Sequence, residues 1–270
     1  MKNRLQNSPI GVFDSGVGGL TVVKELLKIL PSENIIYFGD TARVPYGTKS
    51  KESVIKFSKE IADFLIQKHI KMLLVACNTA SSVALDVLRK KIKIPVIGVI
   101  DSGVSAAVSF TKKNKIGVIG TEATIKSGAY KKQIKRISPN CKVVNRACPL
   151  FVPLVEEGWI NKKITIEIAQ EYLYPLRTFG VDTVILGCTH YPLIKEVIQK
   201  VLGNKITLVD SASTVSLKVK QILKNQKILN TDKKHGYLKF FVSDAPEKFK
   251  KLGKLFLNKK IVSVSKIDVG

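Results

Sequence analysis

Two cysteines, Cys77 and Cys188, stand at matching places in the sequence. Each follows an apolar run typical of a buried strand, residues 73–76 and 184–187, and precedes small polar residues that can begin a helix. Unpaired N–H groups and the dipole at a helix N-terminus lower the pKa of a thiol toward neutrality, where it can act as a general acid or base. A single buried cysteine is more simply explained as a small apolar side chain. Two at matching positions favour an acid/base pair.

Asp14 and Ser15 follow another apolar run, residues 10–13, and open the segment SGVGG. Backbone N–H groups of such a turn can hold a small carboxylate. The segment lacks the last glycine of a dinucleotide fingerprint, because Thr21 stands there, and it has no phosphate-binding lysine. The acidic Asp40 further along keeps a nicotinamide-dependent oxidoreductase as a third alternative. Asp14 can also be a turn or capping residue.

His190 lies two residues after Cys188. A histidine near a cysteine can stabilise the thiolate or share its proton, although a structural histidine bound to the backbone would give the same pattern. Neutral donors that can bind carboxylates or cap helices lie near the same strand ends: Asn78, Thr79, Thr189 and, with weaker support, Thr121.

The remaining cysteines, Cys141 and Cys148, belong to no matched pair, and we interpret them as structural. Four scattered cysteines do not form a disulfide framework in a chain of 270 residues. The sequence has no CxxC, and Cys188 and His190 are too close together for a zinc pair at the usual spacings. We therefore expect no metal and no cofactor.

Short β-branched runs alternate along the chain with longer amphipathic stretches. The expected strands are 10–13, 35–38, 72–76, 95–99, 116–119, 143–145, 183–186 and 206–209, and the expected helices include 20–30, 50–68, 79–91, 164–178 and 193–202. This alternation, with nearly continuous apolar strands, predicts an α/β fold of mainly parallel sheets covered by helices on both faces.

A weak internal repeat divides the chain into two similar halves. IGVFDSG at 10–16 resembles IGVIGTE at 116–122, and LLVACNTASS at 73–82 resembles VILGCTHYPL at 184–193. We expect two pseudo-twofold-related domains with the active site in the cleft between them, because parallel sheets bind ligands at the carboxyl ends of their strands. The first domain is predicted as 1–98 plus 207–270, completed by the strand-like run 238–242, and the second as 99–206.

The motifs VFDSGVGG, PYG, ACNTAS, GCTHYPL and VDSA, in this order and spacing, resemble the glutamate racemase family, part of the wider aspartate/glutamate racemase group. The resemblance runs from about Ile10 to at least Ala212. It implies a pyridoxal-independent isomerase that interconverts L- and D-glutamate and supplies D-glutamate for peptidoglycan, and hence for cell-wall biogenesis and cell shape. It further implies that Cys77 takes the α-proton from D-glutamate and Cys188 from L-glutamate.

The resemblance also assigns supporting roles. It implies that Asp14 sets the protonation state of Cys77 and contacts substrate with Ser15, and that His190 assists Cys188. The other residues that it places around glutamate are Tyr46, Gly47, Asn78, Thr79 and Thr189, with the acidic Asp40 and Glu157 nearby. Two bases suit racemisation, because the α-proton leaves one face of the carbon and returns to the other, so one group is a thiolate while its partner is a thiol.

The charge composition of the chain bears on the alternative functions, in particular on nucleic-acid binding. Basic residues outnumber acidic ones by 45 to 21, a net charge of +24, but 39 of them are lysine and 6 arginine. Specific nucleic-acid contacts favour arginine, so the composition does not favour nucleic acid as a partner. The alternatives are an aspartate racemase and a basic nucleic-acid- or protein-binding regulator, the latter supported only by the lysines of 218–260. No apolar run predicts a signal peptide or a membrane span, so we expect a cytoplasmic protein, with a homodimer left open.

Overall fold

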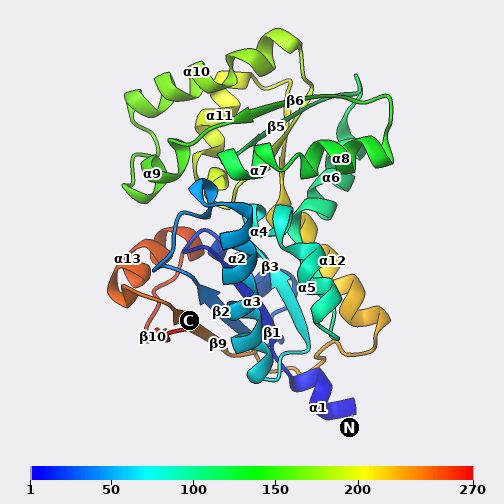
Figure 1. Cartoon of the computed structure of the whole chain (residues 1–270), viewed down its shortest axis with the longest axis vertical. Helices are drawn as coiled ribbons and strands as arrows, with labels where there is room; N and C mark the ends of the chain where they lie inside the picture. The colour runs from blue at the N-terminus through cyan, green and yellow to red at the C-terminus, as the bar shows by residue number, and fades with distance from the viewer. Residues whose placement is uncertain (1, 270) are drawn as a thin grey trace.

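The structure, a computed structural model, describes residues 2–269. Figure 1 shows two α/β lobes stacked along the longest axis of the molecule, each built on one sheet. The first sheet has the strand order β10-β9-β2-β1-β3-β4 and the second the order β6-β5-β7-β8. Every strand pairing is parallel. The predicted fold class, two parallel sheets covered by helices, is therefore confirmed.

The strands of the first sheet are β1 (Ile10–Asp14), β2 (Ile35–Gly39), β3 (Met72–Val75), β4 (Val96–Gly98), β9 (Leu238–Val242) and β10 (Ser265–Lys266). Those of the second are β5 (Lys115–Gly120), β6 (Lys142–Ala147), β7 (Thr183–Gly187) and β8 (Thr207–Asp210). The residues of β1, β2, β3, β4 and β7 are buried throughout, because helices cover both faces of each sheet.

The helices are α1 (Lys2–Asn7), α2 (Leu20–Ile29), α3 (Lys51–Gln67), α4 (Asn78–Val83), α5 (Leu85–Lys91), α6 (Val99–Phe110), α7 (Glu122–Lys126), α8 (Ala129–Ile137), α9 (Phe151–Glu156), α10 (Lys163–Phe179), α11 (Lys195–Leu202), α12 (Ser211–Asn225) and α13 (Pro246–Leu257). Short 3-10 turns form at Tyr46–Thr48 and Tyr191–Ile194. The single helix expected over 79–91 is divided at Ala84 into α4 and α5. No helix within residues 2–269 is long and apolar enough to cross a bilayer.

The two sheets repeat one topology. The order β2-β1-β3-β4 in the first matches β6-β5-β7-β8 in the second, so β1 corresponds to β5 and β3 to β7. The sequence repeat falls on these two strand pairs. Corresponding strands therefore deliver Cys77 and Cys188 to equivalent ends of the two sheets.

One predicted domain boundary is wrong by a strand. The division at 206/207 assigns residues 207–210 to the first domain, but these residues form β8, which pairs with β7 of the second sheet. An apolar run predicts a strand but does not show which neighbouring strand it pairs with. The sequence pattern therefore could not assign residues 207–210 to one of the two sheets. After α12 the chain returns to the first sheet, where β9 lies beside β2.

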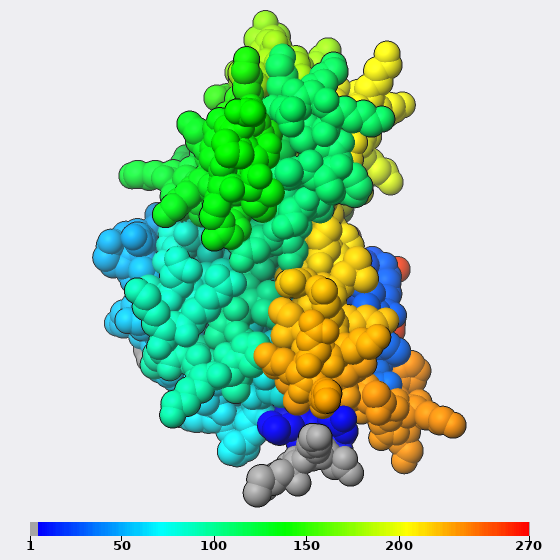
Figure 2. Space-filling view, turned by 90° about the vertical axis from the view of Figure 1, so that its right-hand side faces the viewer, coloured from blue at the N-terminus to red at the C-terminus, as the bar shows by residue number. Residues whose placement is uncertain are grey.

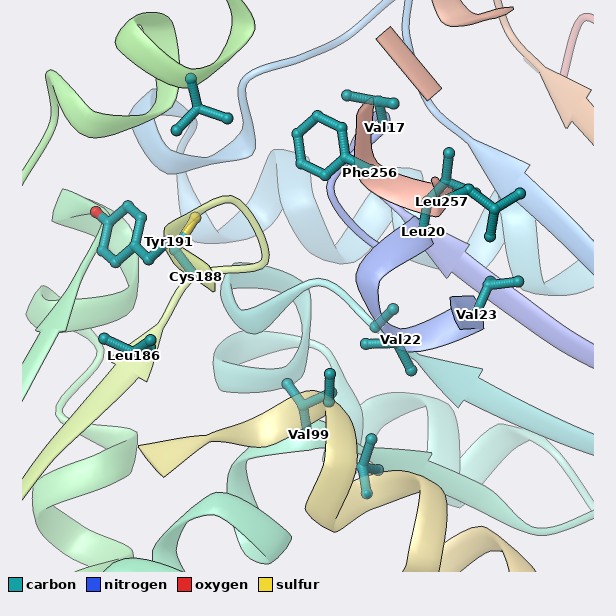
Figure 3. Packing of buried hydrophobic residues seen from close by; sticks show 14 of the residues in the cluster. Val17, Leu20, Val22, Val23, Val99, Leu186, Cys188, Tyr191, Phe256 and Leu257 are labelled. Atoms are coloured by element: carbon teal, nitrogen blue, oxygen red, sulfur yellow. The ribbon is translucent and has the colours of Figure 1, made fainter. Parts of the chain in front are cut away.

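A continuous apolar core joins the lobes. It includes Val17 and Leu20 of the first lobe together with Leu186 and Tyr191 of the second. Figure 3 shows Leu186 and Tyr191 beside Cys188, and Val17 and Leu20 across from them near Phe256 and Leu257. On the face drawn in Figure 2, α6 and α12 lie side by side where the chain passes between the lobes. This packing holds the two strand-end edges facing each other.

Candidate active site

The carboxyl ends of both sheets open on one small cavity. In the first sheet Ser15 and Cys77 follow β1 and β3, and in the second Thr121 and Cys188 follow β5 and β7. The cavity is lined by Ser15, Val44, Pro45, Tyr46, Gly47, Cys77, Asn78, Thr79, Thr121, Val152, Cys188, Thr189 and His190. Its volume is about 20 Å³, room for about one water molecule. The lobes are therefore closed around it.

Cys77 caps α4 and is nearly buried, with an exposed fraction of 5%. Its Sγ accepts the Ala80 N–H at 3.5 Å, and the thiol lies 3.8 Å from Ser15 Oγ, to which it can donate. Burial raises the pKa of Cys77 to about 12, and the nearby Asp14 carboxylate adds to the rise. The lowered pKa expected for Cys77 at this helix N-terminus is therefore wrong, because burial outweighs the hydrogen bonds from Ala80 and Ser15. Cys77 is a thiol at neutral pH.

Asp14 ends β1 and is fully buried behind Ser15, outside the cavity lining. Its Oδ2 accepts the N–H groups of Gly16 at 3.3 Å and Gly19 at 3.0 Å. Burial raises the pKa of Asp14, although nearby His190 and these N–H groups oppose the rise. The glycine-rich turn thus encloses the carboxylate of its own chain. The N–H groups that a dinucleotide phosphate would need are occupied, which argues against the oxidoreductase alternative.

Cys188 has a different neighbour. His190 Nδ1 lies 3.9 Å from Cys188 Sγ, and His190 Nε2 lies 3.0 Å from Glu156 Oε1. Burial alone lowers the pKa of His190, but hydrogen bonds to Cys188 and Glu156 outweigh it and raise the pKa to about 10. His190 is therefore an imidazolium at neutral pH. A cation beside a sulfur favours the thiolate form. The ring of Phe256, from α13 of the first lobe, packs edge-on against His190 with centroids 5.2 Å apart.

Glu156 is a residue that the sequence analysis missed. It named Glu157, which is exposed and lies one residue beyond the end of α9. Residues four apart share a helix face, and Glu156 lies four residues after Val152, which lines the cavity. This spacing is the signal that could have selected the first glutamate of the pair.

Three threonine hydroxyls join the lobes at the cavity wall. Thr79 Oγ1 lies 2.9 Å from Thr121 Oγ1 and 3.0 Å from Thr124 Oγ1, and the last two are 3.0 Å apart. Thr79 belongs to α4, whereas Thr121 and Thr124 begin α7. Each hydroxyl has one proton and can accept, so the three can satisfy one another. Thr124, which lies outside the predicted set, completes this group.

Asp40 is placed near the site but outside its lining. Its buried carboxylate accepts from Arg43 Nε at 2.7 Å, from Ser243 Oγ at 2.8 Å and from the Tyr46 hydroxyl. Asp40 thus holds the turn that presents Tyr46 and Gly47 to the cavity. Both carboxylate oxygens of Asp40 accept hydrogen bonds there.

Close contacts at two glycines bring the lobes together. A Cβ added at Gly18 would lie 2.2 Å from Thr189 Oγ1 and 2.6 Å from His190 Nδ1. A Cβ at Gly47 would lie 2.6 Å from the Thr121 Cβ. Each contact joins a first-lobe backbone to a residue of the opposite half. The closed cavity therefore depends on the absence of a side chain at both positions.

The chain resembles known proteins along its whole length. The family model described as Asp/Glu/Hydantoin racemase matches residues 10–215. A glutamate racemase from Geobacter metallireducens is 53% identical over 96% of both chains, and one from Neisseria meningitidis serogroup A is 47% identical over all of both chains.

Solved structures agree. A glutamate racemase from Francisella tularensis, crystallised with D-glutamate, has a TM-score of 0.93 at 44% identity over 98% of both chains. A glutamate racemase isoform from Bacillus anthracis gives 0.94 at 41% over 97% of this chain and 98% of that one. An aspartate racemase from Picrophilus torridus, 18% identical over 83% of this chain and 99% of its own, shares the fold with a TM-score of 0.60.

Proposed function

The chain belongs to the Asp/Glu/hydantoin racemase family, and from this premise we propose how it interconverts L- and D-glutamate. It is an amino-acid racemase, and its full-length relatives are glutamate racemases. In the proposed mechanism Cys77 and Cys188 exchange the α-proton without a cofactor. The observation that carries the mechanism is the pair of thiols on equivalent strands, facing one cavity from opposite lobes.

The proton moves between two unlike sulfurs. Cys188, beside the His190 imidazolium, serves as thiolate and removes the α-proton from one face of the substrate carbon. Cys77, kept as a thiol by burial and by Asp14, donates its proton to the opposite face. The product leaves Cys188 as the thiol and Cys77 as the thiolate, so the reverse reaction uses the same groups in exchanged roles. We assign abstraction from L-glutamate to Cys188 and from D-glutamate to Cys77.

The cavity offers neutral hydrogen-bond donors to the two carboxylates of glutamate. Neutral donors can bind the carboxylates without adding charge next to the thiolate. Ser15, Tyr46–Gly47, Asn78, Thr79 and Thr189 border the cavity, and we assign them to the two carboxylates. Hydrogen bonds fixed before the reaction stabilise charge that develops on the α-carboxylate as the proton leaves. Glutamate does not fit a cavity of about 20 Å³, so binding requires the lobes to separate at the contacts of Gly18 and Gly47.

Proton exchange in D₂O tests this function. We expect the purified enzyme, with no cofactor added, to incorporate deuterium at Cα of both L- and D-glutamate and to form the opposite enantiomer of each. Aspartate, tested in parallel, should exchange far more slowly. Exchange of aspartate alone would replace the proposal with the aspartate alternative. Salt-dependent DNA binding without any exchange would favour the regulator.

The biological setting completes the proposal. D-Glutamate made in this way would supply peptidoglycan synthesis in the cytoplasm. A strain in which expression of this chain is repressed should lose cell shape and lyse, and added D-glutamate should rescue it. Failure of D-glutamate to rescue would contradict the assigned role.

A further inference from the structure

Tyr130 links the two lobes at the substrate-binding edge. It lies in α8 of the second lobe and is 2% exposed. Its hydroxyl donates to Oδ1 of Asn78, the first residue of α4 in the first lobe, at 2.6 Å. Asn78 is 4% exposed and lines the cavity. A buried side chain of one lobe therefore holds a candidate substrate-binding side chain of the other.

The direction of this hydrogen bond fixes the Asn78 amide. A phenol has one proton to give, whereas an amide has one oxygen that accepts and one NH₂ group that donates twice. Burial raises the pKa of Tyr130 above its ordinary value, so the phenol keeps its proton at neutral pH and acts as donor. With Oδ1 occupied, the NH₂ group is the end left for the cavity.

The surroundings fix Tyr130 as well. A Cβ added at Gly187, the residue before Cys188, would lie 3.2 Å from Cε2 of the Tyr130 ring. The ring is thus seated against the backbone that carries the second thiol. Tyr130 connects the placement of Asn78 to that of Cys188.

We propose that Tyr130 is a positioning residue for racemisation, which orients the Asn78 amide so that its NH₂ group faces a substrate carboxylate. This inference rests on the proposed function. Without the phenol the amide can turn by 180°, and its oxygen, which carries only a partial negative charge and has no proton to donate, would then face the carboxylate. Because the bond crosses between lobes, it forms fully only when they close, so Asn78 becomes a correctly aimed donor in the closed enzyme.

The direct test is Tyr130→Phe, which keeps the ring and removes the hydroxyl. We expect KM for both enantiomers to rise about fivefold to tenfold, the scale of one buried hydrogen bond, with kcat changed less than about twofold. A contact used equally in ground and transition states acts on KM in this way.

The matched control is Tyr191→Phe. Tyr191 is also fully buried and close to Cys188 in sequence, but it donates to the backbone oxygen of Cys148 at 2.9 Å. The Tyr191→Phe enzyme should lose similar thermal stability and keep KM within about twofold of the wild-type value.

A double-mutant cycle separates positioning from general structure. In an Asn78→Ala background, Tyr130→Phe should raise KM no further, because the amide it orients is gone. The same rise in both backgrounds would overturn the proposal, as would an unchanged KM in a folded Tyr130→Phe enzyme. Either result, with wild-type racemisation intact, would leave the proposed function standing.

A second variant covers the case in which Tyr130→Phe does not fold. Asn78→Asp keeps an oxygen for Tyr130 and replaces the NH₂ group with an acceptor. KM should rise at least tenfold and glutamate binding, followed by calorimetry, should weaken equally. A KM within about twofold of wild type would show that the NH₂ group does not face the substrate, and the proposal would fail.

Discussion

Cys77 and Cys188 occupy equivalent positions in two sheets of the same strand order, but their neighbours differ in charge. Two residues after Cys188 stands His190, an imidazolium bound to Glu156. Two residues after Cys77 stands Thr79, which is neutral. The repeat thus places two identical thiols symmetrically, and residues that differ between its two halves make them unlike.

The strand next to each thiol adds to this difference. Asp14 ends β1 beside Cys77, and the corresponding residue at the end of β5 beside Cys188 is Gly120. A carboxylate near Cys77 disfavours its thiolate, whereas the imidazolium near Cys188 favours one. One thiol facing one thiolate is what a two-base racemase needs before substrate arrives. A duplicated fold can thus position two thiols symmetrically, while the charges beside them determine which thiol acts first as the base.

Removing either active-site sulfur should have the largest effect on racemisation. We expect Cys77→Ala and Cys188→Ala each to lower racemisation by about 10³-fold or more, since each loses an acid/base group. Circular dichroism of the substrate measures the rate, and far-ultraviolet spectra check the fold. Cys141→Ala, which removes a buried thiol outside the cavity, serves as the control and should retain activity. Near-normal turnover in either active-site variant would disprove the two-base mechanism.

The carboxylate behind His190 should matter next. In Glu156→Gln the buried imidazole loses its anionic partner, so the pKa of His190 should fall by about one to two units. The basic limb of the kcat/KM profile should move down by the same amount, so activity falls about tenfold at about pH 9 and changes little near neutral pH, where the imidazolium remains. Glu157→Gln, at the exposed neighbouring position, is the matched control and should behave as wild type. Equal effects of Glu156→Gln and Glu157→Gln would show that Glu156 has no specific effect on His190.

Smaller and more specific effects should follow from His190→Asn and Asp14→Asn. We expect His190→Asn to change mainly the primary deuterium isotope effect measured from L-glutamate, and Asp14→Asn mainly that from D-glutamate. Equilibrium requires kcat/KM to fall equally in both directions, so the asymmetry shows in kcat, KM and isotope effects. Asp14 also senses the charge of His190, so the double variant should be non-additive. Identical changes from both enantiomers in both variants would show that the halves act as one unit.

The smallest effect should be on stability. The pKa of His190 is raised from 6.5 to about 10 on folding, so the folded state binds the proton more tightly. The resulting stabilisation is fully present below pH 6.5 and is lost as pH rises to about 10. His190→Asn should flatten this part of the curve of unfolding free energy against pH, measured by urea denaturation. A wild-type slope retained in the variant would assign the effect to other groups.

Much of the site followed from strand-end patterns. An apolar run followed by a polar residue marks the carboxyl end of a parallel strand, and this signal located Ser15, Cys77 and Cys188. The pattern did not locate side chains that reach the cavity, or that contact His190, from helix faces or distant segments. Val152, which lines the cavity, comes from α9. Glu156 and Phe256, which contact His190, come from α9 and from α13 in the C-terminal region. Their positions depend on tertiary packing.

The protonation states were less accessible from sequence than the positions. A cysteine at a helix start predicted a lowered pKa, but burial of Cys77 reverses the direction. Burial depends on how tightly two lobes close, and that follows from contacts between residues such as Gly18 and His190, which are far apart in the chain. The local sequence pattern does not predict how closely the two lobes pack, and so it does not predict the burial of Cys77.

Thiolate absorbance near 240 nm tests the central claim most directly. Burial raises the pKa of Cys77 to about 12 and raises the pKa values of Cys141 and Cys148, so these three sulfurs are thiols at neutral pH. The proposed mechanism predicts one thiolate in the wild-type enzyme in neutral buffer, retained in Cys77→Ser and absent in Cys188→Ser. A thiolate signal that disappears in Cys77→Ser and persists in Cys188→Ser would contradict it.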